Sequence, residues 1–311
     1  MREEPYRDVP SFRAGVEGRL KAAARANPRI AVNDLRRQFV LQRFLARVFA
    51  EPRTRWVLKG GTGLIVRIPG ARHSNDIDLV NPQSDVLVDD AVADLRELAK
   101  HAPAGDLLRF EITDPMAGDG QDVDHVVARV KVTPYLGTAE YAGRFPIDLS
   151  LNQREAEPTE LVQPQPVVDL PGVDPLPAFA LYPLAEQVAD KLCAMYGRYG
   201  RNGDRSSTRY RDLVDLTLIV THQQLDATRA AAALTGEAGR RSLELPLRLT
   251  APNDEWHTNY PRIAAETILP SSLHSLAAAL ETVARCIEPL LDGVVVKGTW
   301  DPSRQRWLTT A

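Results

Sequence analysis

Residues 58–80 read LKGGTGLIVRIPGARHSNDIDLV and set a glycine pair and two aspartates in one compact stretch. The first part, an apolar approach followed by Gly60, Gly61 and Thr62, predicts a strand, a tight turn and the start of a helix. The last part alternates Asp76 and Asp78 with aliphatic residues, and on a strand this spacing puts both carboxylates on one face. The stretch therefore predicts two aspartates held side by side close to a glycine turn.

Two neighbouring carboxylates repel each other unless a cation or a shared proton relieves them. Magnesium is usually bound through one or two carboxylates together with water and substrate phosphate. Glycine turn amides at a helix start bind phosphate oxygens. The stretch thus predicts a nucleoside triphosphate held through a divalent metal. A polymerase-type reaction also needs a third carboxylate, for which Asp148 in the strand-like FPIDLS is the candidate, with a solvent-exposed edge-strand charge as the alternative.

Length and composition indicate a globular protein, because 311 residues with 44% hydrophobic content can bury a sizeable core. We find no signal-peptide pattern in the charged start MREEPYRDVPSFR and no apolar run of membrane-spanning length, so we expect a cytoplasmic protein without a membrane partner. Cys193 and Cys286 lack the spacing of a zinc site and are expected to be buried thiols. The net charge of −3 neither indicates nor excludes nucleic-acid binding.

The pattern of the chain is that of an α+β fold with a mixed sheet. We expect one domain over residues 1–160, a proline-rich connector over 161–180 and a mainly helical domain over 181–311. Asn33 or Asp34 is expected to cap the second of the leading helices, and Ser84 to cap a helix over 85–101. Expected strands cover 55–59, 76–80, 107–113, 124–134 and 144–151; expected helices cover 182–198, 209–222, 223–247, 258–269 and 271–291; a final strand is expected in GVVVKG, 293–298.

The helical half offers further charged candidates. Lys191 lies at the edge of an apolar stripe, where it would contact triphosphate if it faced the metal site; alternatively it snorkels to solvent or pairs with Asp212 as a structural bridge. Asp212 is a first-turn helix acid that the helix dipole would favour in any case, and the residues alone do not separate its role from that of Asp215.

An arginine-rich segment, 197–211, reads as a mobile loop that could grip a polyanion, with Tyr199 or Tyr210 stacking on a base. A solvated connection between helices is the alternative interpretation. Arg72 and His73 could likewise meet phosphate or be exposed. The candidate RNA-binding arginines are Arg198, Arg201, Arg205 and Arg209.

The glycine pair followed by SNDIDL resembles the nucleotidyltransferase signature of the DNA polymerase beta superfamily. The form LKGGTGLIVR, with LAEQVADKLCAMYGR and RYRDLVDL further on, is similar to the AbiEii group, the toxin halves of abortive-infection and MenAT-type toxin–antitoxin systems. The resemblance implies a polymerase-beta-like domain joined to a helical domain that closes the active-site cleft. It also implies NTP as substrate, transfer of a nucleotide to an RNA acceptor such as the tRNA 3′ end, a block of translation, and a cognate antitoxin encoded nearby.

The resemblance also implies roles for individual residues, and it favours Asp212 over Asp215. The catalytic set would be Asp76, Asp78, Lys191 and Asp212; Mg²⁺ or Mn²⁺ would be bound by Asp76, Asp78 and Asp148; and nucleotide would be bound by Lys59, Gly60, Gly61, Thr62, Arg67, Ser74 and Lys191. Two other readings stay open: transfer to a small molecule or a protein side chain, and a non-catalytic protein that senses nucleotide or binds a partner.

Overall fold

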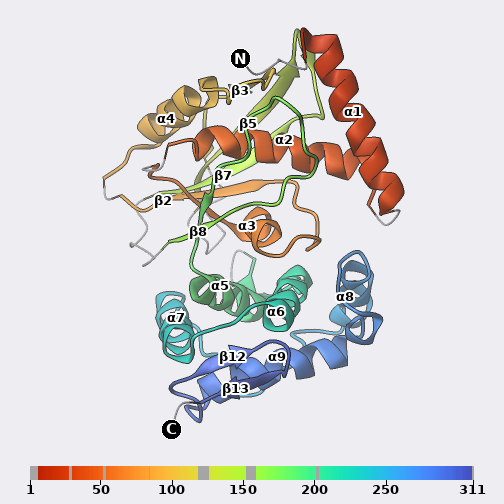
Figure 1. Ribbon diagram of the computed structural model, residues 1–311. Helices are drawn as coiled ribbons and strands as arrows, with labels where there is room; N and C mark the ends of the chain where they lie inside the picture. Colours follow the sequence, from red (N-terminus) through yellow and green to blue (C-terminus); the bar gives the residue numbers. More distant parts are fainter. Residues whose placement is uncertain are drawn as a thin grey trace. The chain divides into compact units, whose positions relative to one another are not determined.

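The structure, a computed structural model, describes residues 6–27, 30–51, 54–83, 85–117, 126–151, 159–200 and 203–309 (Figure 1). The described chain divides into two compact units, each of which is considered by itself. The first unit runs to Tyr182 without Gly70–Arg72, and the second unit combines Gly70–Arg72 with the chain from Pro183 onward.

A mixed sheet forms the centre of the first unit, as the sequence predicts. Its main path among the described strands is β3-β5-β7-β2-β1-β9-β8, with β4 and β6 pairing on β5. The strands β2 and β7 are parallel, as are β1 and β9, while the other pairs are antiparallel. The bounds are β1 Val57–Lys59, β2 Ile77–Asn81, β3 Leu108–Ile112, β4 Met116–Ala117, β5 Val126–Leu136, β6 Ala139–Glu140, β7 Phe145–Leu151, β8 Glu160–Val162 and β9 Phe179–Leu181.

One face of this sheet carries the core of the first unit. Ile77 and Leu79 of β2 are fully buried, as are Ile147 and Leu149 of β7, so each central strand alternates aliphatic and charged positions. Helix α2 (Val32–Val48) crosses β5 and β7 in Figure 1, and its Phe44 makes edge-to-face ring contacts with the sheet phenylalanines. The alternation thus leaves Asp78 and Asp148 on the opposite face.

The other helices of the first unit are α1 (Val9–Ala26), α3 (Gly60–Arg67) and α4 (Val88–Lys100). Asp8 caps α1 by accepting a hydrogen bond from the Ser11 amide at 2.8 Å. The cap predicted at Asn33 or Asp34 is wrong, because α2 begins at Val32 after Ala31 and has no side-chain cap. Helix α4 begins at Val88 after Leu87, and the predicted cap Ser84 lies outside the described residues.

The proline-rich segment belongs to the first unit. Its two ends form the antiparallel pair β8 and β9, and β9 extends the sheet by pairing in parallel with β1. Proline favours extended backbone. The ends of this segment form strands at the edge of the sheet, whereas the sequence predicted a connector between domains. Along the chain, the boundary between the two units falls between Tyr182 and Pro183.

The second unit is mainly helical. Its elements are α5 Leu184–Tyr196, β10 Arg198–Tyr199, β11 Arg205–Ser206, α6 Tyr210–His222, α7 Ala227–Arg240, α8 Trp256–Ala264, η1 Ser271–Leu273, α9 Leu276–Leu291, β12 Thr299–Asp301 and β13 Arg306–Leu308. Its core includes the fully buried rings of Trp256, Tyr260 and Trp300. The strand predicted over 293–298 is wrong, since Val294 and Val296 are exposed in a turn region and the pair β12–β13 begins only at Thr299.

The expectation for the two cysteines is met by the described residues. Cys193 and Cys286 are free and fully buried thiols. Within the described ranges, none of the helices combines the length and the apolar character that crossing a membrane requires.

Candidate active site

The glycine turn and Asp78 form one packed feature in the first unit. Strand β1 ends at Lys59 and α3 begins at Gly60, whose φ of +67° is a left-handed conformation that favours glycine. A Cβ atom on Gly60 would lie 1.9 Å from Asp78 Oδ2, so the Asp78 carboxylate occupies the space that a side chain would need. The glycine therefore lets backbone and carboxylate approach each other closely.

Asp76 is held at both its main chain and its side chain. It lies one residue before β2, which begins at Ile77. The Ser74 hydroxyl donates to Asp76 Oδ1 at 2.6 Å, and the Thr62 hydroxyl donates to the Asp76 carbonyl oxygen at 2.6 Å. Both hydroxyl-bearing residues are buried, so they fix the direction in which the half-buried Asp76 side chain points.

Four charged residues lie in register across four adjacent strands, and we call them the charged row: Lys59, Asp78, Asp148 and Arg129. Asp78 and Asp148 are direct neighbours on the parallel strands β2 and β7. Arg129 of β5 donates to both oxygens of Asp148, with Nε–Oδ1 at 2.5 Å and Nη2–Oδ2 at 2.8 Å. The charged row thus pairs two carboxylates and places a cationic residue at each end.

Asp76 and Asp78 are the two carboxylates of the first unit that could hold a divalent metal. The parts of the chain that the structure describes contain no group of three or more acidic, histidine or cysteine side chains placed to hold a metal ion. Asp76 and Asp78 fit the one or two carboxylates that magnesium takes beside water and phosphate. Asp148, predicted as a third ligand, has both oxygens engaged by Arg129, and its role as a ligand stays a prediction.

The other predicted nucleotide-binding residues of this unit differ in their surroundings. Lys59 is buried at the N-cap position of α3, and Gly61 is buried in its first turn. Arg67 is committed elsewhere: its guanidinium pairs with Glu160 and donates to the Tyr182 carbonyl oxygen at 2.6 Å. Arg67 therefore ties the end of α3 to the sheet edge, and its predicted nucleotide contact finds no support in this geometry.

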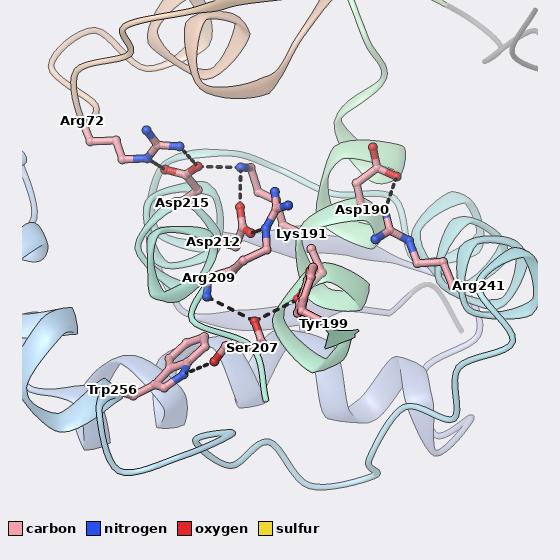
Figure 2. A network of polar contacts seen from close by, with 11 residues as sticks. Arg72, Asp190, Lys191, Tyr199, Ser207, Arg209, Asp212, Asp215, Arg241 and Trp256 are labelled. Atoms are coloured by element: carbon pink, nitrogen blue, oxygen red, sulfur yellow. Dashed lines mark hydrogen bonds and ion pairs between the residues drawn. The ribbon is translucent and has the colours of Figure 1, made fainter. Parts of the chain in front are cut away.

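Lys191 lies in a second cluster, which belongs to the second unit (Figure 2). Its ammonium donates to Asp215 Oδ2 at 2.5 Å and to Asp212 Oδ1 at 3.2 Å. Arg72 donates to both oxygens of Asp215 at 2.8 and 3.0 Å, and Arg209 Nε donates to Asp212 Oδ2 at 2.7 Å. We call these residues, Arg72, Lys191, Arg209, Asp212 and Asp215, the Lys191 cluster.

Burial and charge oppose each other in the Lys191 cluster. Burial alone would lower the pKa of Lys191, but the charges of Asp215 and Asp212 raise this pKa above its ordinary value. Burial would likewise raise the pKa of Asp215, but the charges of Lys191 and Arg72 lower it below its ordinary value. Lys191 is therefore cationic and Asp215 anionic near neutral pH, and the predicted structural bridge to Asp212 is present alongside a closer one to Asp215.

The described part of the arginine-rich segment contains a short strand pair where a loop was predicted. Arg198 and Arg205 lie exposed on the antiparallel pair β10–β11, and Arg209 is bonded in the Lys191 cluster; Arg201 lies outside the described residues. The Tyr199 hydroxyl donates to the Ala194 carbonyl oxygen at 2.8 Å. The Tyr210 ring packs edge-to-face on Trp256. The two tyrosines predicted to stack on bases thus have packing roles in the protein.

Sequence reasoning missed Arg129 and the part played by Asp215. The alternation in VVARVKV, 126–132, places Arg129 on the face opposite Val130, but only the register of β5 on β7 brings it to Asp148. Arg72 was a candidate for phosphate, and it contacts Asp215, 143 positions further along the chain. No local pattern signals that pairing.

A mixed sheet with a glycine turn packed on a strand aspartate agrees with the nucleotidyltransferase signature found in the sequence. Residues 43–282 match the family described as Nucleotidyl transferase AbiEii toxin, Type IV TA system. The match covers most of the chain, and the protein belongs to this family. It is a nucleotidyltransferase toxin of a type IV toxin–antitoxin system, as the sequence resemblance implies.

The chain also resembles solved structures. One is MenT4, a nucleotidyltransferase toxin from Mycobacterium tuberculosis H37Rv, with 21% identity, a TM-score of 0.55 and coverage of 93% of this chain and 92% of that one. JHP933 from Helicobacter pylori has 15% identity and a TM-score of 0.47 over 85% of this chain and 96% of that one. A nucleotidyltransferase-like protein of H. pylori has 18% identity and a TM-score of 0.45 over 83% and 98%. A search of curated proteins finds no match.

The MenT4 likeness supports the α+β fold class predicted from the sequence. Membership of the family supports nucleotidyl transfer from an NTP and implies an antitoxin partner.

Proposed function

We propose that the protein transfers a nucleotide from an NTP to an RNA acceptor, the 3′ end of tRNA, and so blocks translation in the cytoplasm. The packing of the Asp78 carboxylate against the Gly60 turn, with Asp76 close by in the chain, carries this proposal. A phosphate-binding turn and metal-binding carboxylates are the two elements that nucleotidyl transfer requires of a protein.

Asp76 and Asp78 would hold Mg²⁺ or Mn²⁺, and Ser74 and Thr62 orient Asp76 for this task. When bound, the metal supplies positive charge beside the phosphates of the NTP. Gly60 would offer its backbone to the phosphates at the start of α3, where amide groups and the helix dipole favour anions. The acceptor hydroxyl then gives up its proton to water and attacks the α-phosphate in line, forming the new phosphodiester bond while pyrophosphate leaves with the electron pair of the broken bond.

The second unit supplies support for the RNA part of the proposal. Arg198 and Arg205 are exposed on the β10–β11 pair, where guanidinium groups can form bidentate contacts with phosphates. We also propose that Lys191 contacts the triphosphate, as predicted from the sequence. The positive charge of Lys191 at neutral pH supports this role. The choice of tRNA rests on the family resemblance.

The test is incubation of the purified protein with total tRNA, Mg²⁺ and each α-labelled NTP in turn. We expect one NTP to label tRNA, and we expect Asp78→Asn to lower the rate by more than about a hundredfold, because loss of even an outer-shell partner of a metal costs 10–100-fold. Circular dichroism and thermal unfolding check that Asp78→Asn is folded. Asp301→Asn, which changes a strand aspartate of the second unit, is the matched control and should label tRNA normally.

Three outcomes would contradict the proposal at different levels. Labelling that survives Asp78→Asn would remove the assigned site. A folded protein that labels no RNA but does label a small molecule or a protein would correct the acceptor. A folded protein that binds NTP and labels nothing in a cell extract would favour the non-catalytic reading.

A further inference from the structure

Arg129 covers the one carboxylate of the charged row that sequence reasoning assigned as a third metal ligand. Its guanidinium bonds both oxygens of Asp148, which is the bidentate geometry of a strong ion pair. The Asp148 side chain is only 10% exposed, whereas the Arg129 side chain is 45% exposed. The cation therefore lies on the solvent side of a nearly buried anion.

A second arginine–aspartate site in the same unit shows what a purely structural pair looks like. Asp106 accepts from Arg43 at 2.9 Å and from Arg47 at 2.7 Å, and its side chain is 0% exposed. Both arginine side chains are also buried, at 6% and 0% exposure. Separating either arginine from Asp106 within the protein would leave a buried guanidinium charge that water cannot reach, which is costly. Arg129 can instead turn into solvent, where its charge is hydrated.

Asp148 also has an anionic neighbour. Asp78 lies directly beside it on the adjacent parallel strand, so the two carboxylates repel each other unless positive charge is present. Arg129 supplies such charge from the β5 side. A divalent cation on Asp78 would supply it from the other side, and it would repel the guanidinium. Asp148 can thus bind either the Arg129 guanidinium or a divalent metal ion, and these two cations repel each other.

We propose that Arg129 is a positioning residue that competes with the divalent metal for Asp148. The inference rests on the proposed function, because it takes the metal to lie at Asp76 and Asp78. In the protein without nucleotide, Arg129 holds Asp148 and the metal binds weakly through the other two carboxylates. When NTP brings metal and further negative charge, Arg129 releases at least one oxygen of Asp148. The third carboxylate then joins the site only when the substrate is present.

The test measures Mn²⁺ binding without nucleotide, by electron paramagnetic resonance of the free ion. For Arg129→Gln we expect a Kd lower than that of the unmodified protein by on the order of tenfold, because a competing positive charge is removed. Asp148→Asn alone should not lower the Kd, since Arg129 already occupies Asp148 and its positive charge remains in the variant. Asp148→Asn combined with Arg129→Gln should abolish the gain, which makes the two residues strongly coupled in a double-mutant cycle.

Arg129→Lys keeps a positive charge should the glutamine variant fail to fold, and its single ammonium cannot match the bidentate contact. We expect the Kd of Arg129→Lys for Mn²⁺ to lie between those of Arg129→Gln and the unmodified protein. Arg109→Gln removes an arginine that pairs with Glu111 on the neighbouring strand β3 and should leave the Kd unchanged.

Arg129 variants that are folded and bind Mn²⁺ no more tightly than the unmodified protein would overturn the inference. Absence of measurable Mn²⁺ binding in the folded Arg129→Gln protein would overturn it as well. The readout needs no acceptor, so failure of the tRNA assay with a normal Mn²⁺ result would count against the proposed function alone.

Discussion

The charged row of the first unit and the Lys191 cluster of the second unit each set two aspartates among cationic side chains, but they differ in burial. In the Lys191 cluster the side chains of Asp215, Asp212 and Lys191 are 0%, 6% and 8% exposed. In the charged row Asp78 is half-buried and the cation on Asp148 is 45% exposed. Asp215, Asp212 and Lys191 are thus enclosed in the second unit, whereas Asp78 and Arg129 of the charged row reach solvent in the first.

This difference separates stability from ligand binding. A buried carboxylate surrounded by cations finds its partners within the protein, and removing it takes away negative charge that water cannot replace. A carboxylate with an open side can exchange a side-chain partner for a bound cation. We therefore expect changes of the fully buried Asp215 to lower the free energy of unfolding, and changes at the charged row to act on binding and transfer.

The largest expected effect on stability is that of Asp215→Asn. This change removes the fully buried carboxylate charge that Lys191 and Arg72 share, so the free energy of unfolding should fall by about 3–5 kcal/mol. Urea unfolding followed by circular dichroism measures it. Asp114→Asn, which removes an exposed partner of Arg96, should cost less than about 1 kcal/mol. Equal losses from the two changes would show that the Lys191 cluster is not a structural centre.

The contribution of Asp215 should also depend on pH. Its pKa in the folded state lies below the ordinary 3.8, so its stabilisation is present above pH 3.8 and is lost as the pH falls towards the folded-state value. The difference in unfolding free energy between the unmodified protein and Asp215→Asn should be constant near neutral pH and shrink by up to about 1 kcal/mol at about pH 3. A difference that grows in acid would contradict the assigned charge state.

The pKa of Lys191 gives the matching prediction in alkali. It is raised above 10.5 in the folded state, so its stabilisation is complete below pH 10.5 and is lost only as the pH rises through the folded-state value.

Ser74→Ala should have a smaller effect than Asp215→Asn. We expect it to lower the rate of nucleotide transfer and to leave the free energy of unfolding nearly unchanged. It removes the hydrogen bond that orients the Asp76 carboxylate, and loss of such an outer-shell contact costs about 10–100-fold in metal affinity or activity. Transfer kinetics at several Mg²⁺ concentrations measure the loss. Ser303→Ala removes an equivalent 2.6 Å hydrogen bond onto Asp301 in the second unit and should leave transfer unchanged. Full activity of Ser74→Ala would show that the orientation of Asp76 is unimportant.

Local patterns predicted the elements of the fold better than their ends. The alternation of apolar and charged residues placed β2 and β7 correctly, because one buried face enforces a period of two. The cap at Asn33 or Asp34 failed, since a suitable side chain does not by itself set where a helix begins. The proline-rich segment was predicted to be extended, but its place at the sheet edge depends on the pairing of Leu181 with Leu58 of β1, a residue 123 positions earlier.

At the candidate site, short-range chemistry was predictable and long-range partners were not. The turn at Gly60 and the proximity of Asp76 and Asp78 follow from residues within one short stretch. The engagement of Arg67 by Glu160 depends on a contact across 93 positions. Lys191 and Asp212 were matched by order in the chain, but their closeness to Asp215 and Arg72 could be seen only in the folded unit.

The sequence by itself determined the fold class, the family and the paired aspartates, because periodicity and a compact motif are local properties of the chain. The tertiary structure decided which cation faces which carboxylate: Arg129 on Asp148, and Arg72 with Lys191 on Asp215. Ion pairing depends on distance and burial, and both are set by strand register and helix packing between residues far apart in the sequence.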